Sequence, residues 1–162
     1  MTDTLHSIDH SAIKVSQIAV SLLNILAFVL NLPWLAALIA LVMFLGTLFK
    51  APGFGFIYRY FLKPLGWVKP HVLLDNHEPH RFAQGLGGVI MAFGSLVLFA
   101  GSEVLGWGLV WIVVALAALN AFGGFCVGCA LYYWLGRLHL PGFTKTPPAG
   151  TFPGMRPKAE EK

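Results

Sequence analysis

The stretch that decides the fold is residues 13–49, IKVSQIAVSLLNILAFVLNLPWLAALIALVMFLGTLF, in which Lys14 is the one charged residue. Runs of about 20 apolar residues are long enough to cross the roughly 30 Å hydrocarbon core of a bilayer. The polar break at residues 31–33 divides the stretch into runs over 13–32 and 33–49, and its proline suits the first position of a helix. The stretch therefore predicts a tight hairpin of two transmembrane helices.

A second pair of apolar runs follows, over residues 82–101 and 104–122, separated by a short Gly-Ser-Glu turn. The two pairs predict an all-α membrane protein with four transmembrane helices, arranged as two tandem helical hairpins. The connecting segments should lie at the interface on the cytoplasmic side. The segment 55–67 mixes aromatic with basic side chains, which is typical of a chain lying among lipid headgroups.

Composition excludes a soluble globular protein. Apolar residues make up 57% of the 162-residue chain and charged residues only 11%, against about 25% charged in soluble domains. A water-soluble protein of this size leaves a large share of its surface exposed, and this chain has too few polar side chains to cover it. The bilayer is therefore the expected solvent and the first expected partner.

All 11 Lys and Arg residues fall on one side of the predicted topology, while the turn on the other side carries only Glu103. Cytoplasmic loops of membrane proteins collect Lys and Arg. We therefore expect a multi-pass protein of the bacterial inner (plasma) membrane with both termini in the cytoplasm. The basic charge then faces lipid headgroups, so no nucleic acid is expected as a partner.

The predicted organisation has three parts. Residues 1–11 form a polar N-terminal arm, residues 12–140 form the four-helix transmembrane domain, and residues 141–162 form a Pro- and Gly-rich tail that should be disordered. Within the domain, repeat one covers residues 12–75 and repeat two covers residues 76–140.

The repeats rest on a short internal match. A shift of 67 positions places Lys14-Val15-Ser16-Gln17 on Arg81-Phe82-Ala83-Gln84. Two spans in each copy keep both copies the same way up, which predicts a pseudo-two-fold axis along the membrane normal. After a slip of three residues, Phe56 and Arg59 fall on Cys126 and Cys129, so only the second copy carries thiols.

Two polar residues, Gln17 and Gln84, lie about one turn inside the first and third spans. They predict interhelical hydrogen bonds between the hairpins. A polar lining for a permeation path is the alternative, which the scarcity of ionisable groups in the spans disfavours.

The only cysteines, Cys126 and Cys129, carry the clearest chemistry. They follow Gly123-Gly124, which should end the fourth span, and precede an expected interfacial helix. A helix start favours thiolate at Cys126, which should face cytoplasmic water. A permanent disulfide is not expected on that side. The pair therefore predicts thiol redox or sulfur handling, with Cys126 as the attacking and Cys129 as the resolving thiol.

Two alternatives remain for the cysteines, and one further residue is a candidate. A metal site could combine Cys126 and Cys129 with His77 and His80, although no cofactor is expected; or the cysteines could simply be small packing residues. Arg81 could bind an anion or a thiolate, or else snorkel to the headgroups.

Two motifs together suggest a family. They are Pro79-x-Arg81-Phe82-Ala83-Gln84, at the start of the third span, and Asn120-Ala121-x-Gly123-Gly124-Phe125-Cys126-x-Gly128-Cys129, after the fourth. The chain resembles, over about residues 8–140, the small bacterial membrane-protein family called domain of unknown function 4395. The resemblance implies an integral membrane protein of an uncharacterised family, some of whose relatives accompany thioredoxin-like proteins or sulfurtransferases. An extra glycine before Phe125 and the added His77 and His80 depart from the pattern, so the resemblance does not support a metal site.

These features favour an inner-membrane protein whose cytoplasmic-facing dithiol exchanges electrons or sulfane sulfur with a soluble thioredoxin-like or sulfurtransferase partner. The alternative is a non-enzymatic accessory subunit of a larger membrane complex, or of a homo-oligomer. A transporter for a sulfur species is disfavoured because the spans hold few polar groups. Whether the protein is an enzyme stays open at this stage.

Overall fold

The computed structural model describes residues 6–157 of the chain. The elements run in the order β1 (His6–Asp9), α1 (His10–Val29), α2 (Pro33–Leu48), α3 (Gly55–Ile57), a π-helical turn η1 (Tyr58–Leu62), β2 (Val72–Asp75), α4 (His77–Phe99), α5 (Glu103–Gly123) and α6 (Val127–Arg137). The mostly helical fold predicted from the sequence is confirmed.

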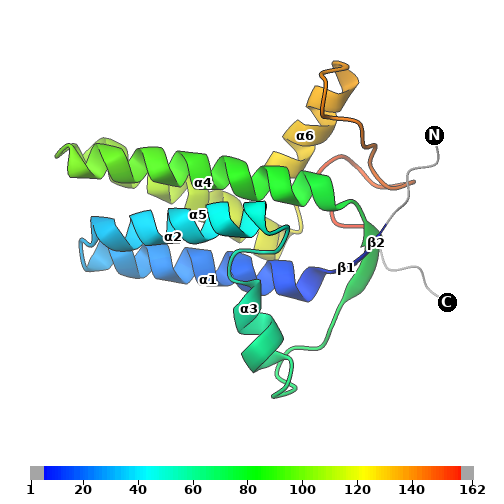
Figure 1. Ribbon diagram of the computed structural model, residues 1–162, viewed down its shortest axis with the longest axis horizontal. Helices are drawn as coiled ribbons and strands as arrows, with labels where there is room; N and C mark the ends of the chain where they lie inside the picture. The colour runs from blue at the N-terminus through cyan, green and yellow to red at the C-terminus, as the bar shows by residue number, and fades with distance from the viewer. Residues whose placement is uncertain (1–5, 158–162) are drawn as a thin grey trace.

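The four long helices form a bundle in which α1 and α4 each lie beside both α2 and α5 (Figure 1). Among the described residues, α1, α4 and α5 are long and apolar enough to cross a membrane, whereas α2 is apolar but has only 16 residues. The core contains Ile39, Met91 and Val110. The outward faces are apolar too, as at Leu22 and Leu41, and a helix that is apolar all round is typical of a lipid environment.

One end of the bundle carries a two-stranded antiparallel sheet that the sequence analysis did not predict, so the fold is not all-α. β1 pairs with β2, which places Ser7 opposite Leu74 and Ile8 opposite Leu73. Strands of four residues are too short to give a clear alternating pattern in the sequence. The pairing joins the segment before α1 to the segment before α4 (Figure 1).

The register of this sheet agrees with the 67-residue shift found in the sequence. Ser7 and Leu74, which the shift superimposes, lie opposite each other. The shift also places His6 on Leu73 and Ile8 on Asp75, so the pair His6–Asp75 corresponds to the pair Ile8–Leu73. Two strands related by a two-fold axis through the central pair must run antiparallel, as these do. A unit of one strand followed by two helices therefore occurs twice, as β1-α1-α2 and β2-α4-α5.

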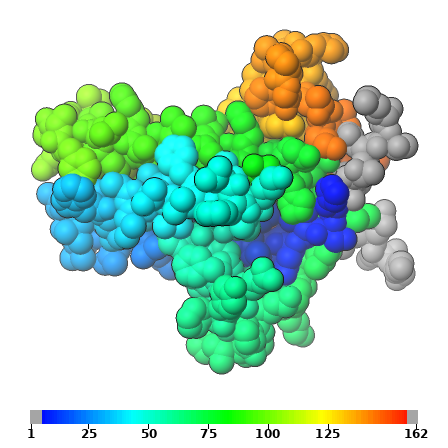
Figure 2. All heavy atoms as spheres, viewed as in Figure 1, coloured from blue at the N-terminus to red at the C-terminus, as the bar shows by residue number. Residues whose placement is uncertain are grey.

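Two short helical segments leave the bundle near this same end. α3 with η1 projects on one side and α6 on the other, and both stand out from the bundle in the space-filling view (Figures 1 and 2). The α3–η1 segment exposes Phe56, Tyr60 and Phe61. It is anchored by Tyr58, whose hydroxyl donates to Asp9 Oδ2 at 2.8 Å.

The segment after α6, which the sequence analysis expected to be disordered, has defined contacts in its described part. Cys126 N donates to Gly154 O at 2.7 Å, and Arg156 N donates to Gly124 O at 3.0 Å. Gly154 has a φ of +87°, and a Cβ there would lie 2.7 Å from Cys126 O, so the close approach requires glycine. Expectations for residues 1–5 and 158–162 lie outside the described residues.

The packing of α4 against α5 provides a test of the bundle. A Cβ at Gly106 would lie 2.5 Å from Leu98 Cγ and 3.0 Å from Gly94 O, whereas a Cβ at Gly108 would meet no atom within 4 Å. We expect Gly106→Ala to lower the free energy of unfolding by about 1–3 kcal/mol through overpacking. Gly108→Ala should leave it unchanged or raise it by up to about 1 kcal/mol. Unfolding of the full chain in detergent micelles, followed by circular dichroism, measures both; equal effects would contradict this packing.

Candidate functional site

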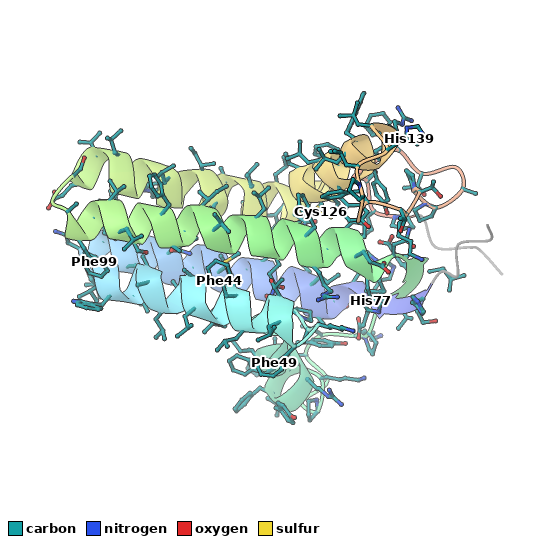
Figure 3. The ribbon with its side chains drawn as sticks, turned by 45° about the horizontal axis from the view of Figure 1, so that its top comes forward. Phe44, Phe49, His77, Phe99, Cys126 and His139 are labelled. Carbon is teal, nitrogen blue, oxygen red and sulfur yellow. A yellow bond between two sulfur atoms is a disulfide. The ribbon has the colours of Figure 1, made fainter. Side chains whose placement is uncertain are left out.

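The two cysteines lie at the start of α6, near the end of the bundle that carries the sheet (Figure 3). Gly124, with a φ of +66°, ends α5 in the left-handed conformation. Cys126 is the N-cap of α6, and its Sγ accepts a hydrogen bond from Cys129 N at 3.1 Å. The two sulfurs are joined in a disulfide. This is the helix start at which the sequence analysis expected them.

Both cysteines are buried, Cys126 at 6% and Cys129 at 3% exposure. The sequence analysis expected Cys126 to face water directly, and it does not. The cause is close packing of α6 on α4: a Cβ at Gly128 would lie 2.6 Å from Ala83 Cβ. Cys126 instead lines a cavity of about 230 Å³ together with Lys50, Arg81 and other residues. Cys129 is not among the described residues that line it. Cys126 is thus the more accessible sulfur of the pair.

A histidine and a carboxylate lie directly behind Cys129. His80 Nδ1 is 3.5 Å from Cys129 Sγ, and His80 Nε2 is 2.9 Å from Asp75 Oδ2. His10 Nε2 lies 3.3 Å from the same carboxylate oxygen. Asp75 Oδ1 accepts from Asn76 N at 2.8 Å. The sulfur, the imidazole and the carboxylate therefore form one continuous polar chain.

The carboxylate of Asp75 is kept ionised by its neighbours. Burial by itself would raise the pKa of Asp75, but the imidazoles of His10 and His80 and the backbone N–H of Asn76 outweigh burial and hold this pKa well below its usual range. An ionised Asp75 can only accept hydrogen bonds, so it favours the His80 tautomer with a proton on Nε2. In this tautomer His80 Nδ1 is an acceptor atom, and it faces Cys129 Sγ.

The residues able to hold a metal ion differ from the predicted set. Two groups have ligand atoms within 4.8 Å of one another: His80 with both cysteines, and His10 with Asp75 and His80. The predicted ligand His77 is in neither described group. Its side chain is exposed, and its ring lies 5.7 Å from the ring of His6 (Figure 3). His77, at the first position of α4, lines the same cavity as Cys126, but no described contact joins it to either sulfur, whereas His80, one turn later, contacts Cys129 Sγ.

Arg81, predicted as a partner for an anion or a thiolate, binds a backbone carbonyl instead. Its Nε and Nη2 donate to Thr47 O at 3.3 and 3.2 Å. The guanidinium thereby connects α4 to the last turn of α2. Arg81 also lines the cavity that reaches Cys126, but no described contact joins it to either sulfur.

The two glutamines have different environments. Gln84 connects α4 to α2 and to the segment after it: its Nε2 donates to Met43 O at 2.9 Å, and its Oε1 accepts from Gly53 N at 3.2 Å. Within the described residues, the Gln17 side chain makes no hydrogen bond. It lines the same cavity as Cys126. The sequence analysis expected interhelical hydrogen bonds for both glutamines, and among the described residues Gln84 makes them and Gln17 does not.

The sequence analysis did not include His10 and Asp75 among the site residues. The repeat offered no signal for Asp75, since the 67-residue shift places it on Ile8. The sheet register pairs Asp75 with His6 at the start of β1, and the contact between Asp75 and His10 is made by their side chains.

The fold and the site together define a class: a bundle of apolar helices compatible with a multi-pass membrane protein, with a Cys-x-x-Cys pair at one end. The family model described as Domain of unknown function (DUF4395) matches residues 8–137, so the chain belongs to that family, and the resemblance noted in its motifs is confirmed. Searches of curated proteins and of solved structures found no match.

The contrast between the glutamines can be tested directly. Gln84→Leu removes the side-chain hydrogen bonds to Met43 O, Ala51 O and Gly53 N, so we expect the free energy of unfolding to fall by about 0.5–2 kcal/mol. Gln17→Leu removes no described hydrogen bond and should change it by less than about 0.5 kcal/mol. The measurement is unfolding of the full chain in detergent micelles. Equal destabilisation by the two substitutions would show that Gln84 does not connect the helices.

Proposed function

We propose that this protein is a thiol–disulfide exchange protein of the inner membrane, with four spans and both termini in the cytoplasm. Its dithiol exchanges electrons with a soluble thiol partner. One observation carries the proposal: Cys129 Sγ contacts His80 Nδ1, and His80 is in turn held by the buried carboxylate of Asp75. Two cysteines that only fill space need no such proton acceptor behind them.

The four-span arrangement is supported by the surface of α2. This helix lies between α1 and α4, both long enough to span, and exposes Leu41 and Leu45 on its outer face. Its 16 residues extend about 24 Å at 1.5 Å per residue, somewhat less than the bilayer core. Local thinning of the bilayer accommodates such a mismatch at modest cost.

The orientation is supported by the distribution of charge. Lys14, Lys50, Arg81 and Arg137 belong to the segments near the sheet, where His77 and Cys126 also lie (Figure 3). The turn next to Phe99, at the opposite end of the bundle, contains no Lys or Arg. By the positive-inside rule, the dithiol end faces the cytoplasm. Because cytoplasmic thiols are kept reduced, a disulfide there is one half of a redox couple rather than a fixed cross-link.

The reaction starts from the reduced protein and a disulfide on the partner. The Cys126 thiolate attacks one partner sulfur, which breaks the partner's disulfide and releases one partner thiolate. His80 Nδ1 takes the proton of Cys129, and the resulting thiolate attacks Cys126 Sγ, which releases the second partner thiolate. Two electrons thus pass from the protein to the partner. The two partner thiolates then take up two protons from solvent, which replace the proton that Cys126 had already lost and the Cys129 proton that His80 Nδ1 releases. The reverse sequence reduces the protein's disulfide.

The environment of each sulfur suits its role in this reaction. Cys126 lines the 230 Å³ cavity, and its Sγ already accepts the Cys129 N–H at the start of α6, which stabilises a thiolate. Cys129 is more deeply buried and has no such donor, so it depends on His80 for deprotonation. Asp75 is a positioning residue, since it touches His80 and neither sulfur.

A disulfide reagent that releases a coloured thiolate, such as DTNB, tests the proposal on the reduced full chain in detergent. The chain has only two cysteines, so all colour comes from them. We expect two kinetic phases, attack by Cys126 and then closure by Cys129. Cys129→Ser should abolish the second phase, and His80→Gln should slow it by about 10²–10⁴-fold without slowing the first. His71→Gln, at an exposed histidine that is not among the described residues lining the cavity, is the matched control and should leave both phases unchanged.

The contrary results are clear. If neither thiol reacts until denaturant is added, the cysteines are packing residues, and the accessory-subunit function replaces the exchange function. If His80→Gln slows neither phase, the proton acceptor is misassigned.

The topology has its own test in intact cells. In a chain whose two cysteines are replaced by serine, a membrane-impermeant maleimide should label Ser102→Cys from outside. Lys63→Cys, on the exposed surface of the loop between η1 and β2, should be labelled only after the membrane is opened. The reverse pattern would place the dithiol on the extracytoplasmic side and contradict the redox argument.

A further inference from the structure

A small cavity lies where α6, the end of β2 and the first turns of α1 and α4 meet. Its volume is about 20 Å³, and its lining includes His10, Asp75, His80, Cys126 and Cys129. That volume suits a single water molecule or ion. The metal-ligating side chains of the site therefore converge on a space of the size of one ion.

The spacing of two of these side chains matches a zinc site. In tetrahedral geometry, with Zn–S of about 2.3 Å and Zn–N of about 2.1 Å, the sulfur and nitrogen ligands lie about 3.6 Å apart. Cys129 Sγ and His80 Nδ1 are 3.5 Å apart. Once the disulfide is reduced, Cys126 contributes a second sulfur from the same helix start, and the three ligand atoms already lie within 4.8 Å of one another.

The surroundings of His80 are those of a metal ligand. A metal-bound histidine usually gives its other ring N–H to a carboxylate, which fixes the orientation of the ring. His80 Nε2 makes this contact with Asp75 Oδ2 at 2.9 Å. The His80 ring thus lies between a sulfur ligand on its Nδ1 side and a carboxylate on its Nε2 side, which is the arrangement that metal-bound histidines show.

A buried nitrogen without a well-directed hydrogen bond also lies in the lining of the cavity. His10 is 4% exposed, and within the described residues its Nε2 has no hydrogen-bond partner. The nitrogen lies 3.3 Å from Asp75 Oδ2 but in a direction that makes no hydrogen bond. Leaving such a group unsatisfied is costly in a buried site. A water bound to an ion in the cavity would give His10 its missing partner.

We propose that the reduced dithiol binds one zinc ion through Cys126 Sγ, Cys129 Sγ and His80 Nδ1, with water in the fourth position. Zn²⁺ replaces the two thiol protons, which are released to solvent, and no electron is transferred. The disulfide form offers no thiolate and does not bind. Metal binding and electron exchange exclude each other at any one moment, because both use the same reduced sulfurs, but neither activity requires the other.

The thiolate set is favoured over the group formed by His10, Asp75 and His80. Thiolates together with imidazole select zinc, whereas a carboxylate with two imidazoles lacks the soft ligands. In addition, the carboxylate oxygen of Asp75 is already engaged by His80.

Cobalt(II) is a suitable probe, because its absorption reports both thiolate ligands and tetrahedral geometry. The full chain in detergent, reduced with a phosphine, should bind one Co²⁺ with thiolate-to-metal charge-transfer bands, and Zn²⁺ should displace it. The oxidised chain should show no such bands. Cys129→Ser and His80→Ala should abolish them, His77→Ala should bind as wild type, and Asp75→Asn should weaken binding by about 10–100-fold.

Three results would overturn the proposal. The reduced wild-type chain could show no thiolate bands, an outcome that requires no substitution and so does not depend on how any variant folds. The Cys126→Ser/Cys129→Ser double variant could still bind Co²⁺, which would assign the ion to His10, Asp75 and His80. His80→Ala could keep the bands at unchanged affinity. The disulfide-exchange kinetics are measured without metal, so the exchange function can fail or stand separately.

Discussion

The antiparallel pairing of β1 with β2 is the interaction on which the site depends. It holds together two segments more than sixty residues apart in the chain, and each strand leads into a long helix. α1 begins at His10 directly after β1, and the backbone amide of His10 donates to His71 O just before β2. The imidazole of His10 contacts the carboxylate of Asp75 at the other end of β2. Asp9 secures the same junction, because its carboxylate accepts from Ser11 N and from the Tyr58 hydroxyl. Burial and the nearby Asp9 raise the pKa of Tyr58 to about 12, so its hydroxyl stays a donor.

Hydropathy predicted the helices well in their apolar parts and poorly at their polar ends. The predicted spans 33–49 and 104–122 differ by one residue at each end or less from α2 and α5. The predicted span 82–101 begins five residues after the start of α4, because the first turn of that helix is the polar sequence from His77 to His80. α1 likewise begins at His10, before the apolar run. The candidate site is built from these polar first turns, and apolar periodicity gives no information about them.

The residues that the 67-residue shift aligns show why neither half of the bundle alone reveals the site. The 67-residue shift places Asp75 on Ile8 and His80 on Ile13, and the later slip places both cysteines on Phe56 and Arg59. The first copy thus retains the strand and helices without the sulfur chemistry, while still contributing His10. Cysteine spacing located the sulfurs from sequence, but their burial and their neighbours follow from packing of α6 on α4 at Gly128.

The contact between the chain's last described residues and Cys126 has an electrostatic consequence for the sulfur. The backbone N–H of Cys126 donates to the carbonyl of Gly154. This N–H is therefore not available to the sulfur of its own residue. The sulfur is left with a single backbone donor, the amide of Cys129. The contact with Gly154, which lies 28 residues further along the chain, therefore limits how much negative charge the sulfur of Cys126 can carry. In the proposed exchange reaction, the segment around Gly154 would thereby influence how readily Cys126 forms a thiolate.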